Sequence, residues 1–359
     1  MTSVPSTSST GSHAPTSDYS VFEHVQVCPL TKQAGGHANT MSETKDGSQV
    51  FKMTEEEETK IYNRIYRDDD PLSSLRSHIP RYAGHFSRSD ISSTVPCTVE
   101  SETGSDSGGT DRYRPLSYWG SRPEYQKDRR KDKVIVLQDT RQGMSNPSYA
   151  DIKLGTTASH PSSSALKKRR QEELGKRTTT HSLGFRLVGG CTVHGGRNVH
   201  WTTEYGENVT AENIDDAMIT LFPSVNDGLL PAENFTGRSL NDIDRSYLDQ
   251  LSGNEKLDRE RNTLQSIRRI QQDVSRLSST LRNVDETFVG SSLFVVWEDG
   301  RAVTKFIDLM RHMPRDGENP DDGVSDGLDS FSLGALETRA QVLERSCRDL
   351  ENELGSAQR

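Results

Sequence analysis

The sequence predicts an α+β fold with antiparallel sheets, and three observations support this prediction. Short apolar runs bounded by turn residues recur along the chain, as at 134–137 (VIVL), and such runs are typical of strands. Asp299-Gly300 separates two apolar runs, which is a strong β-hairpin signal. From about 258 to 282, apolar residues return every three or four positions among charged ones, which predicts an amphipathic helix.

The composition indicates that one compact globule does not account for the whole chain. The 359 residues are only 31% hydrophobic and the mean hydropathy is −0.77, whereas ordinary domains are roughly 45–50% apolar. Residues 1–20, rich in Ser and Thr, predict a disordered tail, and residues 85–132 predict a low-complexity insertion. The folded part is therefore expected to be interrupted by polar segments.

Several classes of protein are disfavoured by what the sequence lacks. No run of about 18 apolar residues occurs, so no membrane insertion is expected, and the N-terminus lacks a signal-peptide pattern. The four cysteines have no paired spacing, which argues against a disulfide framework and a structural zinc site. A net charge of −9 argues against a nucleic-acid partner. We expect a monomer located in the cytoplasm and nucleus.

Each element follows from a local pattern. Strands are predicted at 21–27, 49–52, 134–137, 183–193, 292–298 and 301–309, with a glycine turn at 35–36. Helices are predicted at 55–66 with Thr54 as N-cap, from about Ser164, at 210–222 with Thr210 as N-cap, at 258–282 and at 336–354. The last helix covers fewer than three heptads, so we expect it to dock on the domain and not to form a dimer zipper.

Four features of the sequence are together typical of phosphoryl transfer. They are Lys52 on a strand before a Glu-rich helix, Asp151-Ile-Lys153 after a Pro147 turn, a basic cluster, and Asp308 at the end of a hairpin strand. A lysine steadies nucleotide phosphates, a glutamate holds that lysine, and a late carboxylate holds the metal. Asp151 and Lys153 are two residues apart in an extended segment and point to the same side.

Each of these features also has a plainer interpretation. A lysine in a strand is usually a surface residue, and an aspartate at a strand end is usually a turn former. The basic cluster from Lys167 to Arg186 holds seven cations and two acids. On composition alone, a solvated helix face or a nuclear-localisation patch explains the cluster as well as phosphate binding does.

A more specific signal is the segment at 147–155, PSYADIKLG. Its form, P-x-x-x-D-x-K-x-G, resembles the signature of the inositol polyphosphate kinase family. Further segments resemble that family's motifs in the same order: 33–37 (QAGGH), 51–52 (FK), 58–62 (ETKIY), 79–84 (IPRYAG), 137–139 (LQD), 183–186 (LGFR), 291–293 (SSL), 307–308 (ID) and 327–329 (GLD). The resemblance spans about residues 21–340, apart from the insertion.

The resemblance implies a two-lobed kinase-like fold, of the ATP-grasp or protein-kinase type, with ATP between the lobes. The expected organisation is an N-lobe, a hinge with the start of the C-lobe, a small inositol-phosphate-binding segment, the rest of the C-lobe and a C-terminal helix. These parts are assigned to 21–84, 133–155, 156–182, 183–340 and 341–359.

The resemblance also implies roles for individual residues, with ATP and Mg²⁺ as cofactors and an inositol polyphosphate as substrate. The catalytic residues would be Asp151, Lys153 and Asp308, with Asp308 holding the metal. The ATP site would comprise Lys52, Glu58, Gln138, Thr140, Asp151 and Asp308. The substrate site would comprise Lys153, Lys168, Gln171, Lys176 and Arg311.

The choice of inositol phosphate rests on segment length. Only 27 residues separate Gly155 from Leu183, which fits multikinases and hexakisphosphate kinases within the family. The threonines at 178–180 favour the multikinase type, with tris- and tetrakisphosphate substrates, whereas Gly35-Gly36-His37 favours hexakisphosphate kinases, which make pyrophosphates. Leu309 and Arg311 replace a phenylalanine and a histidine of the family pattern, and these departures leave a non-catalytic scaffold of the same fold as a further alternative.

Overall fold

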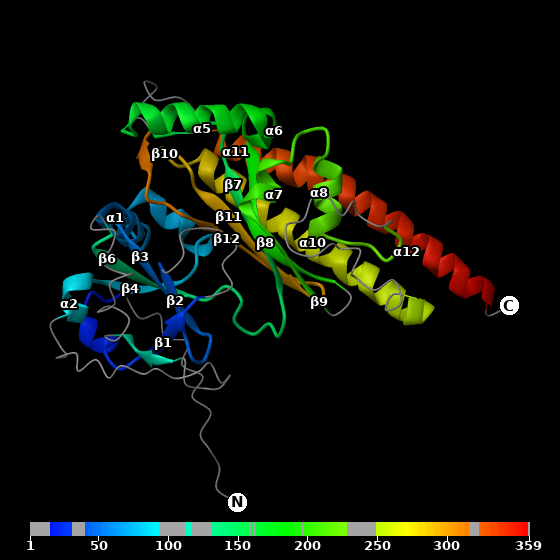
Figure 1. Cartoon of the computed structure of the whole chain (residues 1–359), viewed down its shortest axis with the longest axis horizontal. Helices are drawn as coiled ribbons and strands as arrows, with labels where there is room; N and C mark the ends of the chain where they lie inside the picture. The colour runs from blue at the N-terminus through cyan, green and yellow to red at the C-terminus, as the bar shows by residue number, and fades with distance from the viewer. Residues whose placement is uncertain are drawn as a thin grey trace, which may run out of the picture.

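The computed structural model describes residues 15–30, 40–92, 113–116, 131–157, 159–160, 162–194, 197–227, 249–315 and 323–357. Two lobes are visible in Figure 1, each built on an antiparallel sheet. The predicted glycine turn at 35–36 lies outside the described residues, as do most of the tail and of the insertion. Within the described residues, none of the helices has the length and apolar character needed to cross a membrane.

The smaller lobe contains a six-stranded sheet with the order β4-β6-β3-β2-β1-β5. Its strands are β1 (Gln26–Pro29), β2 (Met41–Thr44), β3 (Gln49–Thr54), β4 (Tyr82–Ser87), β5 (Arg114–Pro115) and β6 (Lys133–Gln138). Its helices are η1 (Tyr19–Val21), α1 (Glu56–Ile65), η2 (Pro71–Ser77) and α2 (Arg88–Ser92).

The larger lobe contains a five-stranded sheet with the order β12-β11-β7-β8-β9. Its strands are β7 (Ser148–Leu154), β8 (Phe185–His194), β9 (Arg197–Trp201), β11 (Ser292–Glu298) and β12 (Arg301–Ile307). A separate two-stranded ribbon pairs β10 (Glu286–Phe288) with β13 (His312–Pro314). Asp299 and Gly300 both have positive φ, 47° and 76°, which is the geometry of a tight two-residue hairpin turn. The hairpin predicted at this dipeptide is confirmed.

The larger lobe also contains helices. They are α5 (Ala165–Arg177), α6 (Thr179–Leu183), α7 (Thr203–Glu207), α8 (Ile214–Leu221), α10 (Gly253–Arg282), α11 (Val324–Asp329), the π-helix η6 (Ser330–Leu336) and α12 (Glu337–Ala357). The helices α10 and α12 run side by side (Figure 1). A capping box formed by Ser252 and Glu255 starts α10. Ala340 and Leu343 of α12 are fully buried, so the prediction that the terminal helix docks on the domain is confirmed.

One hydrophobic core extends through both lobes. Ile61 and Ile65 of α1 and Leu72 of η2 belong to the same buried cluster as Ile270 of α10 and Phe306 of β12. A second cluster, which includes Phe22, Phe51 and Phe86, fills the other face of the smaller sheet. Helix α1 therefore shares this core with β4 and β6 of the smaller sheet and with elements of the larger lobe.

The boundaries of two predicted segments differ from the structure. Tyr19 is buried against Phe86, and the backbone of Thr16 bonds to that of Ala83 and His85, so the predicted tail extends too far. The predicted insertion begins inside β4 and also contains α2 and β5, because the alternating burial of β4 continues to Phe86.

Two predicted N-caps are also corrected. Thr54 ends β3 and its hydroxyl donates to Glu58, so Glu55 occupies the N-cap of α1 without a side-chain bond. The Asn213 side chain accepts the Thr210 N–H at 2.7 Å. This bond forms a turn before α8, which therefore starts at Ile214 and not at Thr210.

Candidate functional site

A cleft of about 500 Å³ is lined by residues of both lobes. The smaller sheet contributes Lys52 of β3 and the segment after β6, and the larger sheet contributes Asp151 and Lys153 of β7. The described residues thus bring together the predicted nucleotide lysine and the predicted D-x-K segment, which are about 100 residues apart in the sequence.

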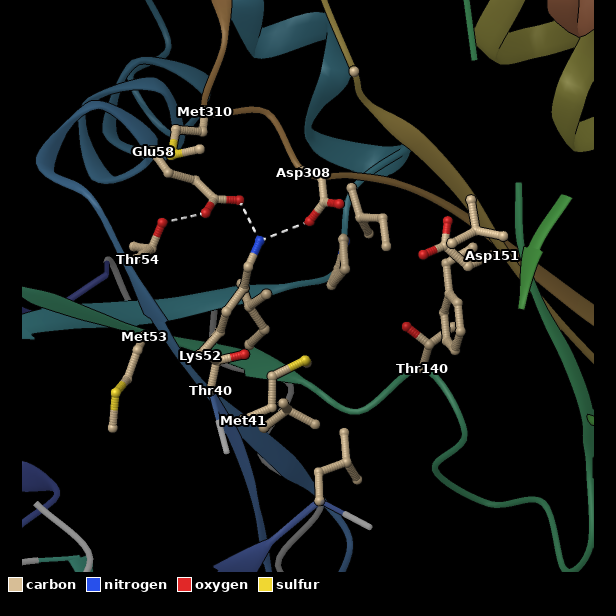
Figure 2. A pocket seen from close by; sticks show the side chains of 18 of the residues that line it. Thr40, Met41, Lys52, Met53, Thr54, Glu58, Thr140, Asp151, Asp308 and Met310 are labelled. Carbon is tan, nitrogen blue, oxygen red and sulfur yellow. Dashed lines mark hydrogen bonds and ion pairs between the residues drawn. The ribbon is translucent and has the colours of Figure 1, made fainter. Parts of the chain in front are cut away.

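Lys52 is held by two carboxylates at one wall of the cleft (Figure 2). Its Nζ lies 2.7 Å from Oε1 of Glu58 and 2.9 Å from Oδ1 of Asp308. Thr54 donates to the other oxygen of Glu58. Burial alone would lower the pKa of Lys52, but Asp308 and Glu58 raise it well above its ordinary value. Lys52 is therefore a permanent, oriented cation, and the predicted Lys52–Glu58 pair is present.

Asp308 lies between two lysines. Its second oxygen accepts a hydrogen bond from Lys153 Nζ at 2.9 Å, and the same ammonium donates to Ser292 Oγ at 3.0 Å. Burial opposes ionisation, but Lys153 and Lys52 hold the pKa of Asp308 well below its usual range. The φ of Asp308 is 63°, a left-handed backbone conformation that a non-glycine residue adopts at some energetic cost.

Asp151 of β7 faces the same cleft. In Figure 2, Asp308 lies between Lys52 and Asp151. The residue is 7% exposed, and its Oδ1 has no hydrogen-bond partner among the described residues. Burial raises the pKa of Asp151, while the nearby Lys153 opposes the shift. A buried oxygen without a partner is costly, so this atom is well suited to accept a hydroxyl of a ligand.

The two predicted hinge residues, Gln138 and Thr140, differ in their hydrogen bonding. The peptide N–H of Gln138 donates to the Arg81 carbonyl at 2.8 Å, so it is not available to a nucleotide base. Thr140 lines the cleft and makes no hydrogen bond to another described residue. Arg141, which the sequence did not single out, lines the cleft between Asp139 and Glu43, at 2.7 and 2.8 Å.

Helix α5 presents Gln171 to the cleft, as predicted, but it presents Lys167 instead of Lys168 or Lys176. Lys167 and Gln171, four positions apart on one helix face, line the cleft. The predicted Lys168 and Lys176 are not among the lining residues. Lys176 lies 3.5 Å from Glu172 on the same helix. The helix predicted from about Ser164 is confirmed, since Ser164 is its N-cap.

Arg311 lines the cleft, as predicted. Its Nη1 lies 3.4 Å from the Ser163 hydroxyl, just before α5. The neighbouring His312 points elsewhere, with Nδ1 3.1 Å from Glu286. The cleft therefore contains Lys153, Lys167 and Arg311, a set of cations suited to phosphate groups.

The carboxylates of the cleft fit a magnesium site that is completed by a ligand. Among the described residues, no group of three or more His, Cys, Asp or Glu side chains could hold a metal on its own. Mg²⁺ usually takes one or two carboxylates together with substrate phosphates and water. Asp308, the predicted metal ligand, lines the cleft and supplies one such carboxylate.

Comparisons with known proteins agree with this geometry. The family model described as inositol polyphosphate kinase matches residues 134–333. An inositol polyphosphate multikinase of Saccharomyces cerevisiae is 28% identical over 183 residues, which cover 48% of this chain and 46% of the relative. The match therefore spans about half the length of this curated relative.

A solved structure has a similar fold. It is that of the inositol phosphate multikinase Ipk2 from S. cerevisiae in complex with ADP and Mn²⁺, with a TM-score of 0.50 and 17% identity. The match covers 81% of this chain and 99% of that chain. At this identity the likeness establishes the fold.

The chain has two lobes, each built on an antiparallel sheet, and a lysine–glutamate pair in one lobe faces an Asp-x-Lys strand in the other. This is the kinase-like α+β architecture that the resemblance implied. Because the family model covers more than half of the chain, the chain belongs to the inositol polyphosphate kinase family.

Proposed function

We propose that the chain is an ATP-dependent inositol polyphosphate kinase that transfers the γ-phosphoryl group to a ring hydroxyl of an inositol phosphate. The observation that carries the proposal is the contact of Asp308 with both Lys52, at 2.9 Å, and Lys153, at 2.9 Å. One lysine belongs to the nucleotide side and the other to the substrate side. Phosphoryl transfer depends mainly on such positioning and on electrostatic stabilisation.

Each side chain then has a defined role. Lys52 binds the nucleotide phosphates and Glu58 orients it. Asp151 accepts a ribose hydroxyl at its unpartnered oxygen. Asp308 holds Mg²⁺, which when bound supplies positive charge beside the transferred group. Lys153 contacts both the transferred phosphoryl group and the acceptor, which keeps the two reacting groups in line.

The hinge receives the adenine. Thr140 is the better candidate of the two predicted hinge residues, because its polar groups lack partners among the described residues while the N–H of Gln138 is engaged. The similar yeast structure is a complex with ADP and Mn²⁺, which supports ATP and a divalent metal as cofactors.

The substrate is proposed to be an inositol tris- or tetrakisphosphate, as in the multikinase group. The multikinase among the relatives and the short segment between β7 and β8 support this choice. A hexakisphosphate kinase would accept the fully phosphorylated ring, and this is the alternative that product analysis distinguishes.

A non-catalytic scaffold is the less favoured alternative. Leu309, which departs from the family pattern, is fully buried in the main core. Arg311 keeps a positive charge at the cleft. Neither departure removes a charged group from the site, which supports an active enzyme.

The activity is tested with purified protein, labelled ATP, Mg²⁺ and a panel of inositol phosphates. We expect phosphate transfer by the wild type and its loss in Asp308→Ala and Lys153→Ala. Magnesium-dependent binding of ATP without transfer to any inositol phosphate would contradict the kinase proposal.

We also propose a monomer in the cytoplasm and nucleus that does not bind nucleic acid. Arg169 and Arg170 on α5 are exposed and do not line the cleft, so they remain accessible to import factors. A fluorescent fusion in which both are changed to Ala should lose nuclear signal while retaining kinase activity. Unchanged distribution would contradict the role of these two arginines.

A further inference from the structure

Four polar side chains, Arg64, Asp70, Glu286 and His312, which we call the Glu286 network, join α1 to the β10–β13 ribbon. Arg64 of α1 donates to Glu286 Oε1 at 2.6 Å and to Asp70 at 3.0 Å. The other oxygen of Glu286 lies 3.1 Å from Nδ1 of His312 on β13. A single carboxylate thus bridges segments that are 222 positions apart in the sequence.

The two carboxylates of the Glu286 network are largely shielded from water, whereas the Arg64 side chain is 34% exposed. The side chains of Glu286 and Asp70 are only 9% and 4% exposed. Burial would raise the pKa of Glu286, but hydrogen bonds from His312 and Arg64 hold it below its ordinary value. Removing one partner of a buried charged pair has a large effect, so these contacts fix the geometry of the two segments.

Each end of the network is on the same element as, or next in sequence to, a residue that lines the cleft. On α1, Arg64 follows Glu58, the residue that holds Lys52 at 2.7 Å. On the ribbon, His312 follows Arg311, whose carbonyl accepts the Val289 N–H at 2.8 Å. The side chain of Arg311 lines the cleft. The network therefore connects the backbone that carries Arg311 to the helix that carries Glu58.

We propose that Glu286 is a positioning residue for substrate binding, acting through Arg311. It holds β13 against α1, so that the Arg311 guanidinium stands at the substrate end of the cleft at a fixed distance from the Lys52–Glu58 pair. This inference rests on the proposed function, because it assigns Arg311 to a phosphate of the inositol substrate. Glu286 itself touches neither substrate nor nucleotide.

The test compares Glu286→Gln with Glu260→Gln. Both glutamates are buried, at 7% and 1% exposed, but Glu260 of α10 bonds to Ser224 and Val225, none of which lines the cleft. In Glu286→Gln we expect the KM for inositol trisphosphate to rise about tenfold, because a small displacement of a binding group has a large effect. The kcat and the KM for ATP should stay within about twofold of wild type. Glu260→Gln should leave both KM values unchanged.

A double-mutant cycle tests whether Glu286 acts through Arg311. In an Arg311→Ala background, Glu286→Gln should cause no further rise in the KM for inositol trisphosphate. His312→Asn removes only one contact of the network, so it should raise the same KM to a smaller extent. This variant decides the question if Glu286→Gln does not fold.

Three results would overturn the inference: equal rises in both KM values, additive effects of Glu286→Gln and Arg311→Ala, or an unchanged KM in His312→Asn. A wild-type protein that phosphorylates no inositol phosphate would instead refute the proposed function. Wild-type activity is therefore measured first, so that the two failures are distinguished.

Discussion

At the residue scale, the rotation of α5 about its axis decides which cation lines the cleft. Lys167 lines the cleft with Gln171, whereas its neighbour Lys168 does not. A hydrogen bond to a charged group contributes about 1.5–3 kcal/mol, and a factor of ten in affinity corresponds to about 1.4 kcal/mol.

Lys167→Ala should therefore raise the KM for the inositol phosphate about tenfold. Lys168→Ala removes the same charge one position along the helix and serves as the matched control, with a clearly smaller effect expected. Steady-state kinetics with saturating ATP measure both. If Lys168→Ala has the larger effect, the assigned face of α5 is wrong.

The sequence predicts most of the side chains that meet at Asp308, because each lies in a short local motif. Lys52, Glu58, Asp151 and Lys153 are recognisable from their immediate neighbours. Other placements depend on contacts between distant segments. Arg141 is held by Glu43, 98 positions earlier, and Lys167 is selected over Lys168 by how α5 packs. Nothing in the local pattern carries that information.

At the element scale, α10 packs on the larger sheet next to the strands that carry the cleft residues. Ile267, Ile270 and Val274 are fully buried in the core that reaches α1. The helix packs on β12, the strand that leads into Asp308. The position of Asp308 thus depends on a helix that does not contribute to the cleft.

Ile270→Ala should lower the free energy of unfolding by about 3 kcal/mol, because deleting buried methyl groups leaves a cavity. Gln272→Ala, at an exposed position of the same helix, should change it by less than about 0.5 kcal/mol. Urea unfolding followed by circular dichroism measures both. A loss under about 1 kcal/mol in Ile270→Ala would contradict the packing described.

Long periodic elements are predicted well and short ones poorly. The apolar repeat of α10 and the Asp-Gly hairpin identify their elements without further context. The sequence does not predict strand β2, because its residues, MSET, contain no apolar run. Its place is set by pairing with β1 and β3 on either side. The start of α8 was misplaced because the Asn213 side chain bonds to Thr210 in a turn before the helix.

At the scale of the whole molecule, the continuous core joins α1 to the larger lobe. Glu58 is thereby held at a fixed position relative to Asp308, and Lys52 on β3 reaches both. The sequence predicts two lobes but not a core shared between them, since α1 is joined to β3 by a single residue, Glu55. The shared core arises from contacts of Ile61 and Ile65 with distant segments.

Acid stability of the fold should depend on His194, a buried residue at the end of β8. Burial, aided by the positive charge of Arg259, lowers its pKa from 6.5 to about 4. The unfolded chain therefore binds the proton more readily than the folded one, and stability falls as pH decreases from 6.5 to 4. At pH 4.5 this one group should reduce stability by about 2–3 kcal/mol relative to pH 7.

Urea unfolding of wild type and His194→Asn at pH 7 and pH 4.5 tests this effect. The difference between the two pH values should be smaller in His194→Asn by about that amount, whatever the stability of the variant at pH 7. The same pH dependence in both proteins would show that His194 does not titrate as described.

The central claim is that the convergence of Lys52 and Lys153 on Asp308 forms the active site of an inositol polyphosphate kinase. It is tested most directly by incubating the protein with MgATP and equimolar inositol tris-, tetrakis- and hexakisphosphate, and by identifying the products over time. We predict that tris- and tetrakisphosphate are consumed with matching release of ADP, that hexakisphosphate persists, and that Asp308→Asn abolishes the conversion. Persistence of all three substrates in the presence of wild-type protein would contradict the claim.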